Sequence, residues 1–541
     1  MNNLIPLPES RTRLLITPRF SMGKHGPKGK VASGWLLSSW LERLTSDASL
    51  AVILFIIGVI SRIPFQSQLL YHWDSVNFAL GMEHFDVRLH QPHPPGYLLY
   101  ILLGRLVNLL IGDANTSLVC ISVVFGGLTT SVVYLLGRRL FRRTEAVISA
   151  MLALTSPAFW FYGEVALTYI LEAFFVTAIA LACLETLRGN RWAAFLSALL
   201  LGLAGGIRQT TLLLMLPLWV FSLRKCSWRL IVATTILLGL TVMSWLAPTI
   251  SLSGGLNSYL IASRSIGGGV LSNFELFGEG QSLLSSLGPF IRLGMYLVYG
   301  LMLGLVPLLY SIIKRLGRPR NTLRQWLSDD RIHVMSLWLI PNLTFYALLV
   351  RAPGHTFSFI PALVLMEASA IVMLSRDLPG WLPWSAIDPI LALTSLILIV
   401  NVAFFLFAPP FLFGVRRVAM TTPSRATIDY RDRYLSERVD YITEHFDAAT
   451  TVVLTAGPDY RHPDFYLHDY YTLNHSTETL ASEVPANGRI LVLFSESLNS
   501  RQDNVQKAVL PSGDLLLVLR LEANCEIIVD ESGVSVQPQV H

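Results

Sequence analysis

The chain has 541 residues, of which 52% are hydrophobic and 14% are charged, and its mean hydropathy is +0.53. Soluble globular chains carry about 25% charged residues, so this composition excludes a soluble protein and predicts an integral membrane protein. The net charge of +5 does not indicate a nucleic-acid partner, because the basic residues fall mostly in short loops between apolar runs, as they do in membrane proteins.

The N-terminal segment, residues 1–47, is basic and polar for more than 30 residues before the first long apolar run. A cleavable signal peptide would place an apolar core closer to the N-terminus, so we expect this segment to remain in the cytoplasm. Within it, GWLLSSWLERL (34–44) predicts an amphipathic helix on the inner face of the membrane.

Residues 48–408 predict an all-α polytopic membrane domain. A helix needs about 20 mostly apolar residues to cross a bilayer, and we predict eleven such helices. They lie near 48–63, 116–136, 145–162, 166–186, 192–207, 209–223, 230–250, 290–313, 332–350, 357–374 and 386–408. One further run, 97–111, is shorter and contains Arg105 and Asn108, so a twelfth span is the alternative.

The basic residues decide between eleven and twelve spans. With 97–111 lying along the membrane, 23 of the Lys and Arg residues before residue 409 fall on one side and seven on the other. Cytoplasmic loops collect basic residues in this way, and a spanning 97–111 would break the bias. We therefore predict that 97–111 is an interfacial helix. Residues 62–115 then form one long external loop, called the first loop below.

Residues 409–541 are more polar and predict a small α/β domain outside the cytoplasm. The short runs TVVLTAG (451–457), RILVLF (489–494) and LLLVLRL (515–521) are typical of buried strands. RYLSERVDYITEHF (433–446) has the apolar spacing of a helix. The four cysteines of the chain are scattered, without the spacing of a disulfide framework or a zinc site.

Acidic residues gather at the external ends of the predicted spans. Asp74 precedes a helical pattern, so it is either a helix N-cap or a functional acid near the hydrocarbon boundary, where acids are costly. Glu164 lies in a short external turn, where a hydrated or capping role is the alternative, and Glu172 lies deeper in the next span. Because paired carboxylates can divide the labour of acid–base chemistry, we predict Asp74 and Glu164 as the catalytic acids.

Four histidines lie in the same part of the first loop: His72, His84, His90 and His93. Their spacing fits neither HExxH nor a compact zinc finger, so the sequence gives no support for a divalent metal and names no cofactor. His93 stands beside Pro94 and Pro95, where it is either a turn element or a hydrogen-bond donor to substrate.

The seven basic residues on the external side are all arginines: Arg62, Arg88, Arg105, Arg208, Arg264, Arg292 and Arg351. Arginine suits bidentate phosphate recognition, although anchoring at the membrane surface is the alternative for any one of them. Arg208, after LAGG, and Arg351, at the start of RAPGH, each lie near a short external turn. Arg208 and Arg351 are the candidates for phosphate contact, and the other predicted substrate-binding residues are His355, His93, Tyr97 and Glu172.

Three motifs carry a resemblance to a known family. The acid early in the first loop is followed by HPPGYLLYILLGRL (93–106), by a span ending in YLLGRRLF (134–141), and by SPAFWFYGEVALTYILEAF (156–174). Together they resemble the GT-C superfamily of membrane glycosyltransferases, in the branch with protein O-mannosyltransferases, aminoarabinose transferases and bacterial polyprenyl-phosphate-dependent enzymes. The resemblance covers roughly residues 48–375.

The resemblance implies a polyprenyl-phosphate-linked sugar as donor, a glycan, lipid or protein as acceptor, and inverting transfer at the outer face of a bacterial cytoplasmic membrane. It implies that Asp74 is the catalytic acid of the first loop, that Glu164 is the acid of the later turn, and that RAPGHTFSFIPALVL (351–365) lies next to the donor phosphate. The chain departs from many relatives in having Ser75 after Asp74 in place of a second acid, and His355-Thr356-Phe357 in place of a basic–Tyr pair.

Other functions remain open from the residues alone. A transporter or lipid flippase is permitted by the intramembrane acids Glu172 and Glu367, although transporters usually show internal repeats and we find none. A glycan polymerase or ligase would use a lipid-diphosphate donor instead. A non-catalytic scaffold would not explain acids gathered on one face.

Overall fold

The computed structural model describes residues 46–271, 283–317, 328–349, 353–378, 388–412 and 421–538, the last range with short gaps at 476–479, 485–486, 503–504, 523–524 and 531–532. The chain divides into two units, Met1–Leu50 and Ala51–His541, and every contact discussed below lies within the second. The amphipathic helix expected at 34–44 lies outside the described residues.

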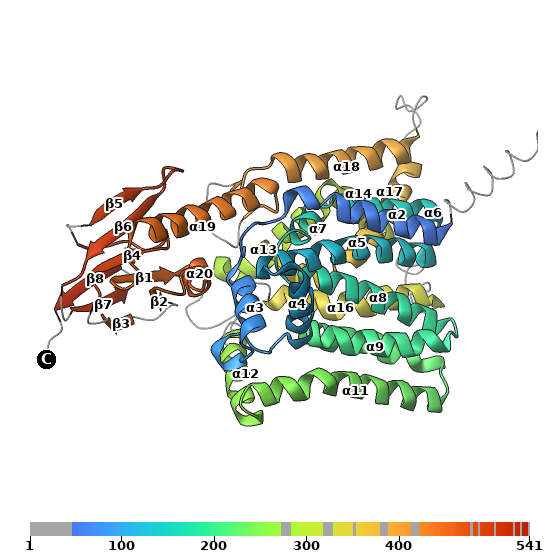
Figure 1. Ribbon diagram of the computed structural model, residues 1–541. Coiled ribbons are helices and arrows are strands. Elements are labelled where there is room, and N and C mark those ends of the chain that lie inside the picture. Colours follow the sequence, from blue (N-terminus) through green and yellow to red (C-terminus); the bar gives the residue numbers. More distant parts are fainter. Residues whose placement is uncertain are drawn as a thin grey trace, which may run out of the picture. The chain divides into compact units, whose positions relative to one another are not determined.

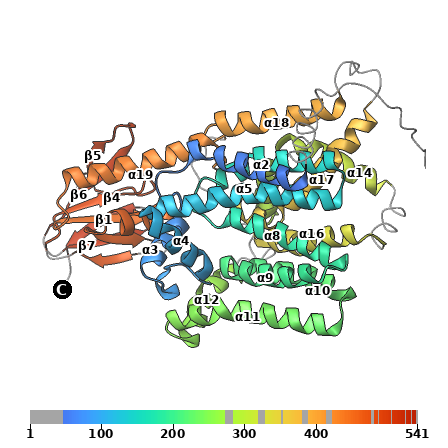
Figure 2. The same ribbon diagram turned by 45° about the vertical axis from the view of Figure 1, so that its right-hand side comes forward.

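The described residues before 408 are almost entirely helical (Figure 1 and Figure 2). The helices are α2 (Asp47–Ile60), α3 (Trp73–Glu83), α4 (Leu98–Ile111), α5 (Ala114–Leu140), α6 (Arg143–Thr155), α7 (Pro157–Tyr162), α8 (Tyr169–Leu187), α9 (Arg191–Ile207), α10 (Gln209–Ser222), α11 (Trp228–Leu252), α12 (Leu256–Leu271), α13 (Leu283–Leu301), α14 (Leu305–Leu316), α16 (Asp330–Leu349), α17 (Ile360–Asp377) and α18 (Pro389–Phe407). Short 3₁₀ helices are η1 (Ile63–Phe65), η2 (Val87–Leu89), η3 (Leu223–Lys225), η5 (Met302–Gly304) and η6 (Pro353–Ser358).

Six stretches in the described part of the chain are long and apolar enough to cross a membrane by themselves. They are Asp47–Phe65, Ala114–Leu140, Tyr169–Leu187, Trp228–Leu252, Phe290–Leu316 and Pro389–Phe407. The other five predicted spans coincide with α6 plus α7, α9, α10, α16 and α17, which are shorter or less apolar. One is interrupted where Pro157, which has no amide hydrogen, begins α7. The prediction of an all-α polytopic membrane protein is confirmed.

Helix α4 is the apolar run that could have been a twelfth span. Its 14 residues extend only about 21 Å at 1.5 Å per residue, less than the bilayer core of about 30 Å. Leu109 and Leu110 are 82% and 89% exposed, whereas Tyr100 and Ile101 are completely buried. Figure 1 shows α3 and α4 running across the direction of α5, α8 and α9. The length and the one-sided exposure favour the predicted interfacial position.

The C-terminal part contains the α/β fold that the sequence predicts. Its elements are α19 (Arg425–His445), η9 (Gly457–Asp459), α20 (His462–Tyr466), β1 (Thr451–Ala456), β2 (Tyr471–His475), β3 (Leu480–Glu483), β4 (Ile490–Leu493), β5 (Gln506–Val509), β6 (Leu515–Arg520), β7 (Cys525–Asp530) and β8 (Gly533–Pro538). The predicted strands are β1, β4 and β6, and the predicted helix is the second part of α19. This small α/β region is therefore confirmed.

The strands form two sheets. The larger has the order β2-β1-β4-β6-β5, with β1 parallel to β2 and β4, and β6 antiparallel to β4 and β5. Helix α19 packs on one face of it, where Leu435 and Ile442 share a buried hydrophobic cluster with Val492. The opposite face packs, through Leu454 and Leu491, against the antiparallel sheet β3-β7-β8. Burying apolar side chains on both faces of the central strands stabilises this arrangement.

Candidate functional site

Asp74 lies in the first turn of α3, but it does not cap this helix. The N-cap is His72, whose Nδ1 accepts a hydrogen bond from the Asp74 amide (3.1 Å), while the His72 amide donates to Ser75 Oγ (3.4 Å). The capping alternative for Asp74 is therefore wrong. Its carboxylate remains available for other contacts, and the positive end of the helix dipole favours its ionised form.

Two histidines face the Asp74 carboxylate. His93 Nδ1 lies 3.3 Å from Oδ1, and His72 Nδ1 lies 3.5 Å from Oδ2. Burial acts to raise the pKa of Asp74, but His93, His72 and Arg208 outweigh it and hold the pKa below its usual range. Burial also lowers the pKa of His93. At neutral pH the group therefore contains an ionised carboxylate beside a neutral imidazole.

Tyr97 extends this group from the start of α4. His93 Nε2 and Tyr97 Oη lie 3.0 Å apart. Tyr97 has φ 59° and ψ 30°, a left-handed conformation that costs a residue other than glycine about 1–3 kcal/mol. The preceding turn is held by Gln209 Nε2 and Tyr259 Oη, which both donate to the Pro95 carbonyl at 3.0 Å. These contacts fix the orientation of the two side chains next to the carboxylate.

Arg208 and Glu172 form a buried ion pair where α9 meets α10. Arg208 Nε lies 3.1 Å from Glu172 Oε2, and Arg208 Nη1 donates to Thr168 Oγ1 (3.2 Å). Thr211 Oγ1 donates to Glu172 Oε1 (2.8 Å). Glu172 is 1% exposed and faces the protein interior, as expected of an acid within a span. The arginine compensates a carboxylate that would be costly to bury alone.

Gly206 explains why LAGG precedes this arginine. A Cβ added at Gly206 would lie 2.5 Å from side-chain atoms of Leu99. Only a glycine allows α9 and the first turn of α4 to approach so closely. The two elements that carry Arg208 and Tyr97 therefore meet at a glycine contact.

Arg208 also acts electrostatically on Asp74, His93 and Tyr97, called the Asp74 group below. Its charge is among those that lower the pKa of Asp74 and of His93. It also opposes the burial that raises the pKa of Tyr97 to about 12. The charge of Arg208 therefore affects the protonation of Asp74, His93 and Tyr97 together.

His355 packs against Tyr169 and Tyr346, and Tyr169 in turn lies against Arg208. Its ring centroid lies 6.0 Å from that of Tyr169 and 5.3 Å from that of Tyr346. The Arg208 guanidinium carbon lies 4.7 Å from the centroid of the Tyr169 ring. The predicted site residues that the structure brings together are thus Asp74, His93, Tyr97, Glu172, Arg208 and His355.

Glu164 has a different environment from Asp74. It is completely buried after α7, and burial raises its pKa well above the usual range, against the opposing effects of Arg62 and Trp160. Among the described residues, no hydrogen bond or ion pair joins Glu164 to Asp74. The two predicted catalytic acids therefore do not form a hydrogen-bonded pair.

Two further expectations concern parts of this region. Arg351, the second predicted phosphate-binding arginine, lies outside the described residues. In the ranges that the structure describes, no group of three or more His, Cys, Asp or Glu side chains could hold a metal ion.

The sequence did not predict that α19 holds the first loop. The Asp432 carboxylate accepts hydrogen bonds from Ser67 Oγ (2.8 Å), the Gln68 amide (2.8 Å) and the Leu69 amide (3.2 Å). Arg431 Nε donates to the Tyr71 carbonyl (3.1 Å). Residues 67–71 are thus tied to one turn of α19.

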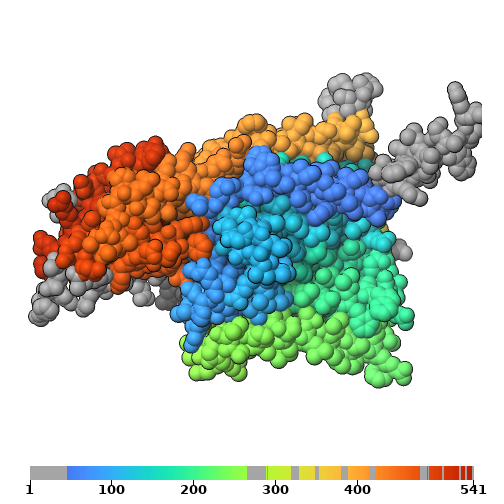
Figure 3. Space-filling view, viewed as in Figure 1, coloured from blue at the N-terminus to red at the C-terminus, as the bar shows by residue number. Residues whose placement is uncertain are grey.

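The short helix α20 and the residue before it continue this contact. Tyr466 Oη accepts a hydrogen bond from the Leu70 amide (2.8 Å). Arg461 Nε donates to Asn77 Oδ1 (3.0 Å), and its Nη2 donates to the Leu89 carbonyl (2.6 Å). In Figure 3 the blue surface of the first loop lies directly against the orange and red C-terminal surface. The C-terminal part therefore fixes the backbone on both sides of Asp74.

Replacing Asp432 with alanine is expected to loosen the first loop. Hydrogen bonds to a charged group contribute about 1.5–3 kcal/mol, so amides 68–77 should exchange with deuterium faster. Hydrogen–deuterium exchange measured by mass spectrometry tests this, with the exposed Asp440→Ala on the same helix as control. Unchanged exchange over 68–77 would show that Asp432 does not hold the loop.

One family model matches the chain. It is described as dolichyl-phosphate-mannose-protein mannosyltransferase and matches residues 92–251. This range contains His93, Tyr97, Glu164, Glu172 and Arg208. The search of curated proteins gave no match.

Several solved structures resemble the fold at low sequence identity. ArnT from Cupriavidus metallidurans bound to undecaprenyl phosphate is 12% identical, with a TM-score of 0.48, covering 91% of this chain and 98% of that chain. The apo oligosaccharyltransferase from Archaeoglobus fulgidus is 15% identical, with a TM-score of 0.45, covering 80% and 65%. AglB from the same organism, in complex with an inhibitory peptide and a dolichol-phosphate, is 14% identical, with a TM-score of 0.43, covering 81% and 64%. At these scores, the functional assignment depends on the family match and on the geometry of the site.

Proposed function

We propose that the chain is a membrane glycosyltransferase of the GT-C superfamily, and that it moves a sugar from a polyprenyl-phosphate donor to a glycan, lipid or protein acceptor. The reaction would take place at the outer face of the cytoplasmic membrane, with inversion at the anomeric carbon. The matched family is described by a dolichyl-phosphate sugar, which supports a lipid-monophosphate donor. The observation that carries this proposal is geometric: His93 Nδ1 lies 3.3 Å from the Asp74 carboxylate, and Arg208, whose charge lowers the pKa of Asp74, is held by the buried Glu172.

Asp74 serves as the proton acceptor in this proposal. The acceptor hydroxyl attacks the anomeric carbon while its proton passes to the Asp74 carboxylate, and the bond from that carbon to the phosphate oxygen breaks. The transition state resembles an oxocarbenium ion, so a nearby negative charge also stabilises it. His93 and Tyr97 keep the carboxylate oriented, since His93 lies between the carboxylate and the phenol.

Arg208 stabilises the lipid phosphate as it leaves. Glu172 and Thr168 hold the guanidinium, and its five N–H donors leave others for phosphate oxygens. Arginine is well suited to this bidentate contact. The neutral pair with Glu172 keeps the arginine in place before the donor binds, so no reorganisation is needed when charge develops on the phosphate.

The type of lipid donor, monophosphate or diphosphate, distinguishes this proposal from a glycan polymerase or ligase. Purified protein in nanodiscs would receive undecaprenyl-phosphate sugars and undecaprenyl-diphosphate sugars in parallel, with an envelope extract as acceptor. Sugar transfer from the monophosphate donors alone is expected. Transfer only from diphosphate donors would indicate a polymerase or ligase, and movement of lipid across the bilayer without transfer would indicate a flippase.

The rate of sugar transfer should not fall near neutral pH through protonation of Asp74. A carboxylate whose pKa is lowered below 3.8 stays ionised above that value and becomes protonated only as pH falls through the lowered pKa. Because burial also lowers the pKa of His93 below 6.5, kcat should stay level as pH falls from about 8 to 6.5. A pH profile of lipid-phosphate release checks this, and a steep loss across that interval would contradict the assigned charge states.

A further inference from the structure

A cavity of about 340 Å³ lies between the first loop and the C-terminal part. Its volume is at the lower end of the about 300–1,000 Å³ typical of small-molecule sites. The lining side chains come from the first loop, from the chain before α19, from α19 itself and from the loops after β1 and β4. Asp74 is not among the lining residues, but His72 is.

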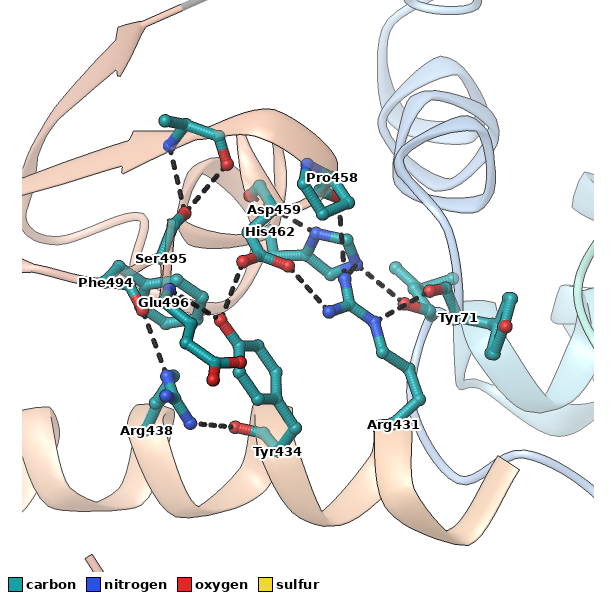
Figure 4. A network of polar contacts seen from close by, with 12 residues as sticks. Tyr71, Arg431, Tyr434, Arg438, Pro458, Asp459, His462, Phe494, Ser495 and Glu496 are labelled. Atoms are coloured by element: carbon teal, nitrogen blue, oxygen red, sulfur yellow. Dashed lines mark hydrogen bonds and ion pairs between the residues drawn. The ribbon is translucent and has the colours of Figure 1, made fainter. Parts of the chain in front are cut away.

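A rigid polar network forms one wall of this cavity (Figure 4). Arg431 Nη1 donates to Asp459 Oδ1 (2.6 Å), and Tyr434 Oη donates to Asp459 Oδ2 (2.8 Å). The Glu496 amide in turn donates to Tyr434 Oη (3.1 Å). Asp459 is 2% exposed, and although burial acts to raise its pKa, Arg431 outweighs that effect and lowers it. The wall is therefore fixed before any ligand arrives.

The charges of the lining disfavour an anionic ligand. Arg431 is neutralised by Asp459, and the further carboxylate in the lining belongs to the exposed Glu496. A phosphate or a lipid headgroup of the same charge would meet no uncompensated cation in this wall. With two carboxylates, Asp459 and Glu496, and one cation, Arg431, in its lining, this cavity suits a neutral group.

The remaining lining fits a sugar ring. Tyr430 and Tyr434 have ring centroids 6.2 Å apart, and Phe411 lies edge-on to Tyr430 at 5.3 Å. Aromatic faces can cover the C–H face of a pyranose, while hydroxyl and carboxylate groups at Ser497 and Glu496 can bond its hydroxyls. A mostly apolar cavity with a few polar groups of this kind is typical of ligand sites.

His72 connects the cavity with the carboxylate. It lines the cavity, and its Nδ1 accepts the Asp74 amide hydrogen and lies 3.5 Å from Asp74 Oδ2. We propose that this cavity binds a neutral sugar ring of the acceptor, next to the carboxylate that receives the acceptor proton. This inference rests on the proposed function, and it assigns the C-terminal part a role in choosing a glycan-bearing acceptor.

Saturation-transfer difference NMR on the full-length protein in nanodiscs tests the site directly. The probes are methyl α-mannopyranoside, methyl β-glucopyranoside and methyl β-galactopyranoside. Wild type and Asp74→Asn should both give a signal with at least one probe. Ser497→Trp, which places a large ring at the exposed edge of the cavity, should reduce that signal at least tenfold, and Glu496→Ala should weaken it. Ser512→Trp, an exposed serine on the β5–β6 turn, is the matched control and should leave it unchanged.

The outcomes separate this inference from the proposed function. No signal from any methyl glycoside with wild type, or an equal signal from wild type and Ser497→Trp, would overturn the sugar site even if donor-dependent transfer is observed. In another outcome, the wild type binds a methyl glycoside and Ser497→Trp loses that signal, while the wild type transfers no sugar. That outcome would support the sugar site and count against the proposed function. In transfer assays, Ser497→Trp should raise the acceptor KM at least tenfold while leaving the donor KM unchanged.

Discussion

Replacing Asp74 with asparagine is expected to lower sugar transfer by about 10²- to 10⁴-fold, the range typical of a lost general base. Asparagine keeps the size of the side chain but can neither take a proton nor supply a negative charge. The fold should survive, because the helix cap is made by His72 and Ser75 and Asp74 is partly exposed. Mass spectrometry of envelope glycans from cells carrying only the variant measures the effect.

Glu83→Gln is the matched control for this substitution. Glu83 lies at the end of the same helix and is exposed, so its loss should change neither protein level nor product. Asp74→Asn protein should accumulate to the wild-type level. Near-normal product from the Asp74 variant would remove this residue from the reaction and leave His93 as the group to test next.

Replacing Arg208 with glutamine is expected to cost both stability and transfer. The substitution leaves Glu172 buried without its cation, and breaking a buried pair in this way costs about 3–5 kcal/mol. The loss of a donor to the leaving phosphate should lower kcat by a further about 10²- to 10³-fold, as removing a transition-state hydrogen-bond donor does. Thermal unfolding of the detergent-solubilised protein and transfer assays measure the two effects.

The double variant Glu172→Gln/Arg208→Gln separates the two roles of the arginine. Two neutral amides can hydrogen-bond with each other, so most of the lost stability should return. Transfer should remain as low as in the single variant, because no cation faces the phosphate. Recovery of transfer together with stability would mean that Arg208 serves only to neutralise Glu172.

Features governed by local patterns were predictable from the sequence. The length of 97–111 and the distribution of basic loops pointed to an interfacial helix, and α4 has the short length and one-sided exposure that this requires. The buried strands β1 and β4 were recognisable because their side chains are apolar on both faces. The one-sided strand β7, with alternating burial, gave a weaker signal and was not predicted.

The site was only partly predictable, because its geometry depends on distant contacts. An acid before a helical pattern is normally an N-cap, and only the structure shows that His72 takes this role. The hydrogen bond from Ser67 to Asp432 joins residues 365 positions apart, and no local pattern encodes such a contact. Glu164 and Asp74 were grouped because both lie at the ends of predicted spans, whereas burial beside Arg62 gives Glu164 a separate environment.

Release of free polyprenyl phosphate is the most direct test of the central claim. Purified wild-type protein in nanodiscs, given undecaprenyl-phosphate sugars and an envelope extract, should release undecaprenyl phosphate that liquid chromatography–mass spectrometry can quantify. Glu83→Gln should match the wild type, and Asp74→Asn should release at least 100-fold less, the lower end of the expected about 10²- to 10⁴-fold loss. Equal release by wild type and Asp74→Asn, or no donor-dependent release by the wild type, would contradict the account.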